Sequence, residues 1–151
     1  MKETMYFEVL IHAPVQKVWD TMLAQETYKQ WTSVFDPTSH YDGSWSKGSG
    51  IKFLAADGSG MISEIAENIQ YKRISIKHLS EVRRGAEDAS FGEETNLFPA
   101  YENYTFADKG GQTELSIDME MPSSKRAKAM KEMFEGMWPN ALLKLKELCE
   151  K

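Results

Sequence analysis

The C-terminal segment, residues 122–151, constrains the fold of this 151-residue chain more than any other part. Pro122 and Ser123 precede a pattern in which apolar residues recur every three or four positions, as on one face of a helix. The apolar positions are Met130, Phe134, Met137, Trp138, Ala141, Leu142, Leu145 and Leu148. A single helix of this length needs a large partner surface. Because the sequence upstream is mostly strand-like, we expect that partner to be one curved antiparallel sheet.

The remaining sequence predicts a strand, two short helices and six further strands before the long helix. Thr4 to His12 alternates as a strand does, and helices are expected from Val15 to about Ala24 and from Glu26 to Trp31. Turn residues then recur at short intervals, which is typical of adjacent hairpins. Strands are expected over 41–45, 51–56, 61–67, 71–80, 97–107 and 113–121. We therefore predict an α+β fold in which a seven-stranded antiparallel sheet wraps the terminal helix, with a kink before Pro139 or a break into two helices there.

The composition indicates one globular domain of ordinary make-up. Hydrophobic residues form 41% and charged residues 27% of the chain, and its net charge is −5. An acidic body argues against nucleic acid as the main partner, although residues 123–151 carry an excess of basic side chains. The apolar runs are too short to span a membrane, and residues 1–4 lack the apolar core of a secretion signal. We expect a cytoplasmic protein, either monomeric or homodimeric.

Several segments together resemble the helix-grip superfamily, which includes START domains, the birch pollen allergen Bet v 1 and polyketide cyclases. The similarity is carried by Ala13–Asp20, Trp31, Gly43–Ser49, Gly110–Leu115, and Met137–Trp138 followed by Leu142–Leu148. Within that superfamily, the chain is most similar to a bacterial branch related to the C-terminal domain of the activator of the 90-kDa heat-shock protein ATPase. The resemblance implies a cavity between the sheet and the long helix.

The resemblance also implies a function, which we formulate as three hypotheses. The first is the binding of a small hydrophobic molecule, lipid-like or polyketide-like, without a cofactor. The second is an interaction module that stimulates a chaperone ATPase. The third is an enzyme of the cyclase or dehydratase kind. The superfamily shares no single catalytic signature, so the resemblance transfers no catalytic residue to this chain.

Two polar residues interrupt apolar faces of strands that are expected to lie near each other. His78 shares a face with Ile74 and Ile76, and Glu102 lies among Ala100, Tyr104 and Phe106. Buried polar groups need partners, so we expect His78 and Glu102 to hydrogen-bond each other or a ligand. Glu64 would join them if it points inward with Ile62 and Ala66, but the opposite face, Met61, Ser63 and Ile65, is equally apolar. The pair therefore fits an internal polar network, ligand recognition or general acid–base catalysis.

Aromatic residues and methionines supply the candidates for the cavity wall, because methionine adapts to different apolar shapes. Plain core packing is the alternative for each of them. Together with Glu64, His78 and Glu102, the candidate ligand-binding residues are Trp31, Phe35, Phe53, Ile76, Tyr104, Met133, Met137 and Trp138.

Other segments carry less chemistry. Residues 83–95 lack periodicity, so we expect a long loop that is either a solvated connection or a lid over the cavity. The glycines of residues 43–50 lack the spacing of a phosphate-binding loop and indicate a hairpin turn. His12, His40 and His78 lack metal-ligand spacing, and Cys149 near a helix C-terminus is unsuited to nucleophilic catalysis. We predict neither a metal site nor a catalytic cysteine.

Overall fold

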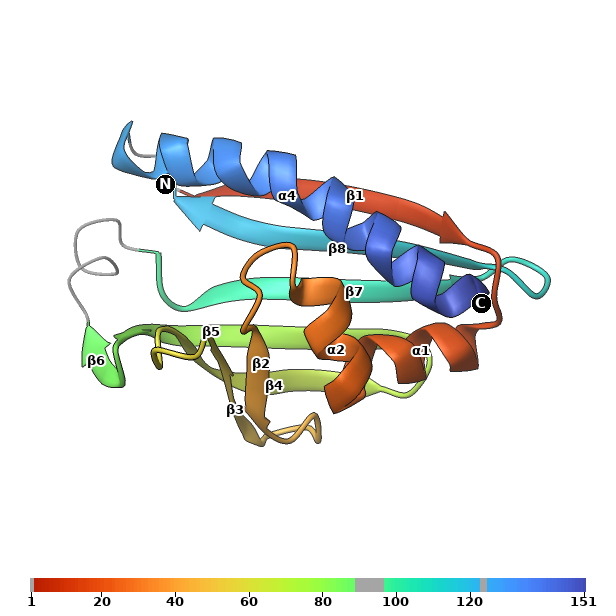
Figure 1. Ribbon diagram of the computed structural model, residues 1–151, viewed down its shortest axis with the longest axis horizontal. Coiled ribbons are helices and arrows are strands. Elements are labelled where there is room, and N and C mark those ends of the chain that lie inside the picture. Colours follow the sequence, from red (N-terminus) through yellow and green to blue (C-terminus); the bar gives the residue numbers. More distant parts are fainter. Residues whose placement is uncertain (1, 89–96, 123–124) are drawn as a thin grey trace.

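The computed structural model describes residues 2–88, 97–122 and 125–151, which form an antiparallel sheet with helices on one face (Figure 1). The strands are β1 (Lys2–Ile11), β2 (His40–Gly43), β3 (Gly50–Leu54), β4 (Gly60–Ile69), β5 (Arg73–Arg83), β6 (Ala86–Asp88), β7 (Ala100–Asp108) and β8 (Thr113–Pro122). The helices are α1 (Val15–Leu23), α2 (Gln25–Thr32) and α4 (Lys125–Glu150). The predicted α+β helix-grip class and the order of its elements are confirmed.

The sheet has the order β1-β8-β7-β5-β4-β3-β2, with the short β6 paired to β5 as an eighth strand. All its pairings are antiparallel, and β2, β3, β4, β5, β7 and β8 follow one another as a meander. The first strand pairs with the last, so that Met5 lies opposite Met119. The predicted meander is therefore present, and β1 extends its far edge.

Two predictions about irregular segments need correction. The segment from residue 83 is not a loop throughout, because Ala86–Asp88 form β6 and pair with Glu81–Arg83. The rest of the proposed lid, residues 89–96, lies outside the described residues. The long helix does not break, since α4 is continuous and contains Pro139. The kink before Pro139 stays a prediction.

The core lies between the sheet and helices α1, α2 and α4. Its fully buried side chains include Ile11, Val18, Ile74, Leu115 and Leu145, which come from strands and from both α1 and α4. The last turns of α4 are also fixed by hydrogen bonds, because Lys146 donates to the Leu10 carbonyl at 2.8 Å and the His12 amide donates to Glu150 at 2.8 Å. This end of the helix is held against the strand with which the chain begins.

Tight turns define the opposite end of the sheet. Gly60 has a φ of 155°, and a Cβ at this position would lie 1.7 Å from the Phe53 carbonyl oxygen. Glycine is therefore required where β3 turns into β4. This turn and the end of β5 surround the opening described below.

Candidate functional site

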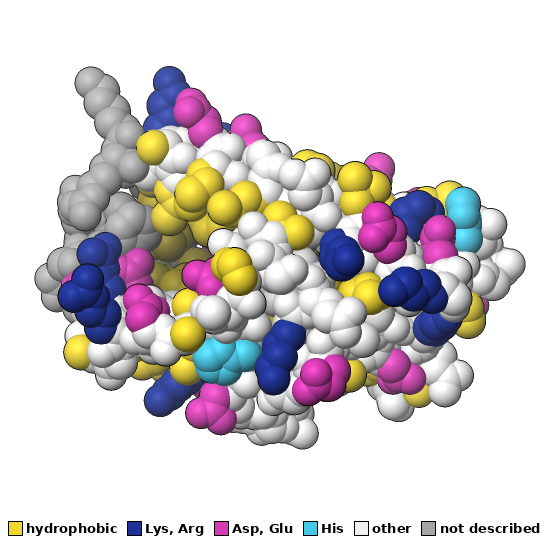
Figure 2. All heavy atoms as spheres, in the orientation of Figure 1, with side chains coloured by type: hydrophobic (Ala, Val, Ile, Leu, Met, Phe, Trp, Pro, Cys, Tyr) yellow, Lys and Arg dark blue, Asp and Glu magenta, His cyan; other side chains and the backbone are white. Residues whose placement is uncertain are grey.

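A cavity of about 580 Å³ lies between the sheet, α2 and the N-terminal half of α4. Figure 2 shows a hollow on this side of the molecule, with hydrophobic side chains above and below it. Most of the residues that line the cavity are aromatic residues or methionines: Met22, Tyr28, Trp31, Phe35, Trp45, Phe53, Met61, Phe98, Tyr101, Tyr104, Met119, Met121, Met130, Phe134 and Trp138. Such a wall favours apolar molecules, whose transfer out of water is favourable.

Trp138 connects the helices to the inner part of this wall. Its ring lies 4.9 Å from that of Phe35, 6.1 Å from that of Trp31 and 6.3 Å from that of Tyr104, measured between centroids. The Trp31 indole N–H donates to the Met22 carbonyl at 3.1 Å, which fixes its ring. These aromatic contacts, in which edges meet faces or rings are tilted, favour a rigid inner surface.

A polar cluster lies within the apolar wall. The hydroxyl of Ser63 is 2.6 Å from His78 Nδ1, and His78 Nε2 is 3.2 Å from Glu102 Oε1. The Tyr104 hydroxyl donates to the other oxygen of Glu102, Oε2. His78, Glu102 and Tyr104 line the cavity, whereas Ser63 lies behind His78 and is 2% exposed. The predicted hydrogen bond between His78 and Glu102 is thus present.

The surroundings of this cluster keep nearby phenols protonated. Burial raises the pKa of Tyr104 well above its ordinary value, and the charge of Glu102 and the hydrogen bond to it act in the same direction. Burial and the charge of Glu102 also raise the pKa of Tyr28, against the effect of a hydrogen bond with Ser39. Both tyrosines are therefore hydrogen-bond donors over the whole physiological pH range.

The mouth of the cavity carries paired charges. Arg83 Nε lies 2.9 Å from Glu81 and 3.2 Å from Asp88, and Glu120 lies 3.9 Å from Lys2 while accepting from the Tyr101 amide at 2.8 Å. Arg84 also lines the mouth and has a φ of 50°. Among the described residues that line the cavity, Glu102 is thus the carboxylate that contacts neither lysine nor arginine; its partners are His78 and Tyr104.

Eight of the predicted residues line the cavity, and three do not. Those that line it are Trp31, Phe35, Phe53, Ile76, His78, Glu102, Tyr104 and Trp138. Their contribution to ligand binding is a proposal that we develop below.

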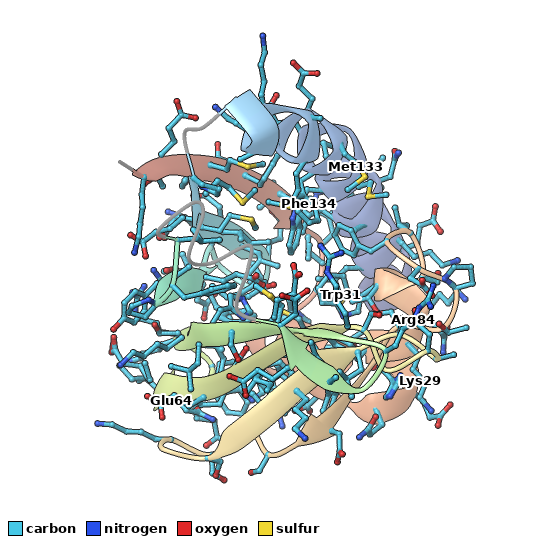
Figure 3. All side chains as sticks on the ribbon, turned by 90° about the vertical axis from the view of Figure 1, so that its left-hand side faces the viewer. Lys29, Trp31, Glu64, Arg84, Met133 and Phe134 are labelled. Carbon is cyan, nitrogen blue, oxygen red and sulfur yellow. The ribbon has the colours of Figure 1, made fainter. Side chains whose placement is uncertain are left out.

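Glu64, Met133 and Met137 were placed in the cavity wrongly. Glu64 points to the outer face of the sheet and lies 3.7 Å from Lys77, because Ser63 and Ile65 occupy the inner face of β4. Met133 is 49% exposed and points away from the cavity, whereas Phe134 points inward (Figure 3). Met137 is half-buried but is not part of the cavity wall.

The sequence contained signals for several wall residues that the prediction missed. Met130 and Phe134 precede Trp138 by eight and four positions, so all three share one helix face. Tyr28 precedes Trp31 by three positions on α2. Ser63, which does not line the cavity but contacts His78, belonged to the alternative face of β4 considered above. Among the described residues, no cluster of His, Cys, Asp and Glu has the arrangement of a metal site.

Comparison with known proteins assigns the family. The model of the family described as activator of Hsp90 ATPase homolog 1-like protein matches residues 12–150. A search among curated proteins gave no significant match. Within the described residues, no helix is long and apolar enough to cross a membrane.

Solved structures share the fold at low sequence identity. Protein MLL2253 from Mesorhizobium loti superposes with a TM-score of 0.74 and is 16% identical, with 97% of this chain and 96% of that chain covered. The Aha1 dimer from Colwellia psychrerythraea has a TM-score of 0.69 and is 17% identical, over 98% and 96% of the two chains. DynU16, from the dynemicin biosynthetic locus, has a TM-score of 0.70 and is 17% identical, over 98% of this chain and 47% of that one.

These similarities agree with the sheet, the two short helices and the long terminal helix described above. At such identities the solved structures show the fold alone. The family match covers nearly the whole sequence, and the chain therefore belongs to the activator of Hsp90 ATPase homolog 1-like family.

Proposed function

We propose that this domain binds a small, largely apolar molecule in the cavity between the sheet and α4. The observation that carries the proposal is the cavity itself, about 580 Å³ in volume and lined mainly by aromatic rings and methionines. This volume falls within the range of roughly 300–1,000 Å³ that is common for small-molecule sites.

The energetics of packing support this interpretation. Protein interiors are normally packed as densely as organic crystals, so a large apolar cavity forgoes stabilising contacts. Bulkier side chains at Ala100 or Ser59 would reduce the volume, yet both positions in the wall are small. A ligand that fills the space would restore the missing contacts and stabilise the fold.

The direct test is native mass spectrometry of the protein purified from its source, combined with intrinsic fluorescence. Trp31, Trp45 and Trp138 all line the cavity, so we expect their emission to change when an apolar probe binds. A copurified apolar molecule, lost on unfolding, would support the proposal.

A pair of variants on one strand links binding to the cavity. Ile76→Phe adds volume inside the cavity, whereas Leu79→Phe adds the same ring at a position of β5 that is 40% exposed. We expect Ile76→Phe to weaken probe binding at least about tenfold and Leu79→Phe to leave it unchanged. Equal affinities for both variants and the parent would refute binding in this cavity.

The family description suggests a second candidate function, the stimulation of a heat-shock ATPase. We propose it as an alternative because the family match spans residues 12–150. The test is the ATPase rate of a 90-kDa heat-shock protein with and without this domain. Stimulation that is retained in Ile76→Phe would favour an interaction surface over the cavity as the functional element.

A further inference from the structure

Glu102 acts as a hydrogen-bond acceptor inside the cavity. Its two carboxyl oxygens face two donors of the protein, His78 Nε2 at 3.2 Å and the Tyr104 hydroxyl. Because the pKa of Tyr104 is raised, its phenol keeps the proton that it donates. The protein thus surrounds this carboxylate with donors and holds it in place.

His78 has no free ring nitrogen with which to hydrogen-bond a ligand in place of Glu102. Ser63, which is 2% exposed, occupies Nδ1 at 2.6 Å, and Glu102 occupies Nε2. The network assigns the ring proton: with neutral imidazole, Ser63 donates to Nδ1 and Nε2–H donates to Glu102. A protonated ring also donates to Glu102 from Nε2. In both forms His78 is fully engaged.

Glu102 retains acceptor capacity toward the cavity. A carboxylate has about four lone-pair sites, of which two are used here. The Glu102 side chain is 19% exposed, and the residue lines the cavity. The other lining carboxylates, Glu81 and Glu120, are paired with Arg83 and Lys2 near the mouth.

From this arrangement we infer that the ligand is an apolar molecule with one hydrogen-bond donor, a hydroxyl or an amine, which binds the free side of the Glu102 carboxylate. The inference rests on the proposed function and adds the chemistry of the ligand's polar end. The apolar body would lie against Trp31, Phe53 and Trp138, which line the same cavity.

The same arrangement disfavours an apolar acid such as a fatty acid. A ligand carboxylate beside Glu102 would place two negative acceptors together in a poorly solvated space. The competing anchor for an anion is Arg84, which lines the mouth and forms no ion pair with a described residue. An anionic ligand would therefore bind with the opposite orientation, polar end outward.

The test compares decan-1-ol, decylamine and decanoate, which share one chain length and differ in the polar end. Affinities are measured by tryptophan fluorescence on the full chain. We expect the alcohol and the amine to bind at least about tenfold more tightly than decanoate. Comparison of the first two identifies whether a neutral or a charged donor is preferred.

The variants locate the origin of this preference. Glu102→Gln gains an amide donor, so the preference should fall below about threefold. Glu64→Gln makes the same change of charge on the outer face of the sheet and should retain the full preference. If Glu102→Gln does not fold, Tyr104→Phe replaces it: removal of one donor frees a further acceptor site, and decan-1-ol should bind at least as tightly as to the parent.

Several outcomes would overturn the inference. They are decanoate binding that equals or exceeds the binding of the alcohol and the amine, an unchanged preference in Glu102→Gln, or weaker decan-1-ol binding in Tyr104→Phe. Weaker decanoate binding in Arg84→Gln would instead support the outward orientation of an anionic ligand. Failure of the proposed function is a different result: none of the three probes would bind, and Ile76→Phe would behave like Leu79→Phe.

Discussion

The two halves of α4 pack against the same sheet but differ in how deeply their apolar side chains are buried. In the C-terminal half, residues 139–150, Ala141, Leu142, Leu145 and Cys149 are at most 3% exposed and belong to the main core. In the N-terminal half, residues 125–138, Met130 and Phe134 are only half-buried and line the cavity. The difference indicates that the C-terminal half stabilises the fold, whereas the N-terminal half contributes side chains to the wall of the cavity.

The largest expected effect is on the free energy of unfolding, which should depend on the half of α4 in which a side chain is truncated. Leu145→Ala should lower the free energy of unfolding by about 2–5 kcal/mol, because it leaves a hole in a fully packed region. Phe134→Ala should cost only about 1–2 kcal/mol, since its ring already borders a cavity. Urea denaturation of both variants measures the difference, and equal losses would remove the distinction between the halves.

Pro139 lies where the two halves meet. Pro139→Ala should raise the free energy of unfolding by about 1–3 kcal/mol, because proline lacks the amide hydrogen and strains a helix interior. We expect probe affinity to fall at the same time, since the N-terminal half would change direction over the cavity. Asn140→Ala, at an exposed neighbouring position, is the control for binding. An unchanged probe affinity in Pro139→Ala would show that the proline does not shape the site.

Substitution of two buried serines should separate an effect on stability from an effect on ligand binding. Ser63→Ala should cost about 1–2 kcal/mol, because His78 Nδ1 loses its partner. The affinity for decan-1-ol should weaken, because the His78 ring is no longer fixed from behind and the Glu102 carboxylate that it orients loses its defined position. Ser75→Ala removes a comparable 2.6 Å hydrogen bond, to Asn103, outside the cavity. Its cost in urea denaturation should be similar and its probe affinity unchanged. Weaker binding in both variants would point to a general loss of structure.

The smallest effect appears only at high pH. Below pH 10 both folded and unfolded chains keep the Tyr104 proton; above it the unfolded chain releases the proton first, because the folded pKa is raised. Stability should therefore fall as the pH rises above 10, by at most about 1.4 kcal/mol per pH unit for this group. Tyr104→Phe should make the fall shallower in urea titrations between pH 9 and 11, whereas Tyr6→Phe, at an exposed position, should not. Identical slopes in all three proteins would contradict the assignment.

Much of the fold could be predicted because alternation and helical spacing directly reflect burial. Met5 and Ile11, which share one of the two alternating faces of β1, are buried, and so are Leu142 and Leu145 of the predicted apolar helix face. β6 was missed because Ala86, Glu87 and Asp88 contain no alternating apolar pattern. The pairing of β6 depends instead on the turn at Arg84 and Gly85, which both have positive φ.

The site was predictable where a polar residue interrupts a clear apolar face. His78 and Glu102 stood out in this way, and β5 and β7 bring them within 3.2 Å. Glu64 was misplaced because both faces of β4 are apolar, so alternation could not decide between them. Met133 was misplaced because consecutive helix residues are rotated by about 100°, which takes it off the face of Phe134.

The pairing of β1 with β8 has a consequence for how the domain folds. Met5 and Met119 are neighbours in the sheet although 114 positions separate them in the chain. Contacts of such long range are slow to form, because the intervening loop must first be closed against its entropy. We therefore expect the cavity walls to form late in folding, after β1 has paired with β8 and α4 has packed against the sheet. During synthesis, β1 stays without this strand partner until β8 has been made.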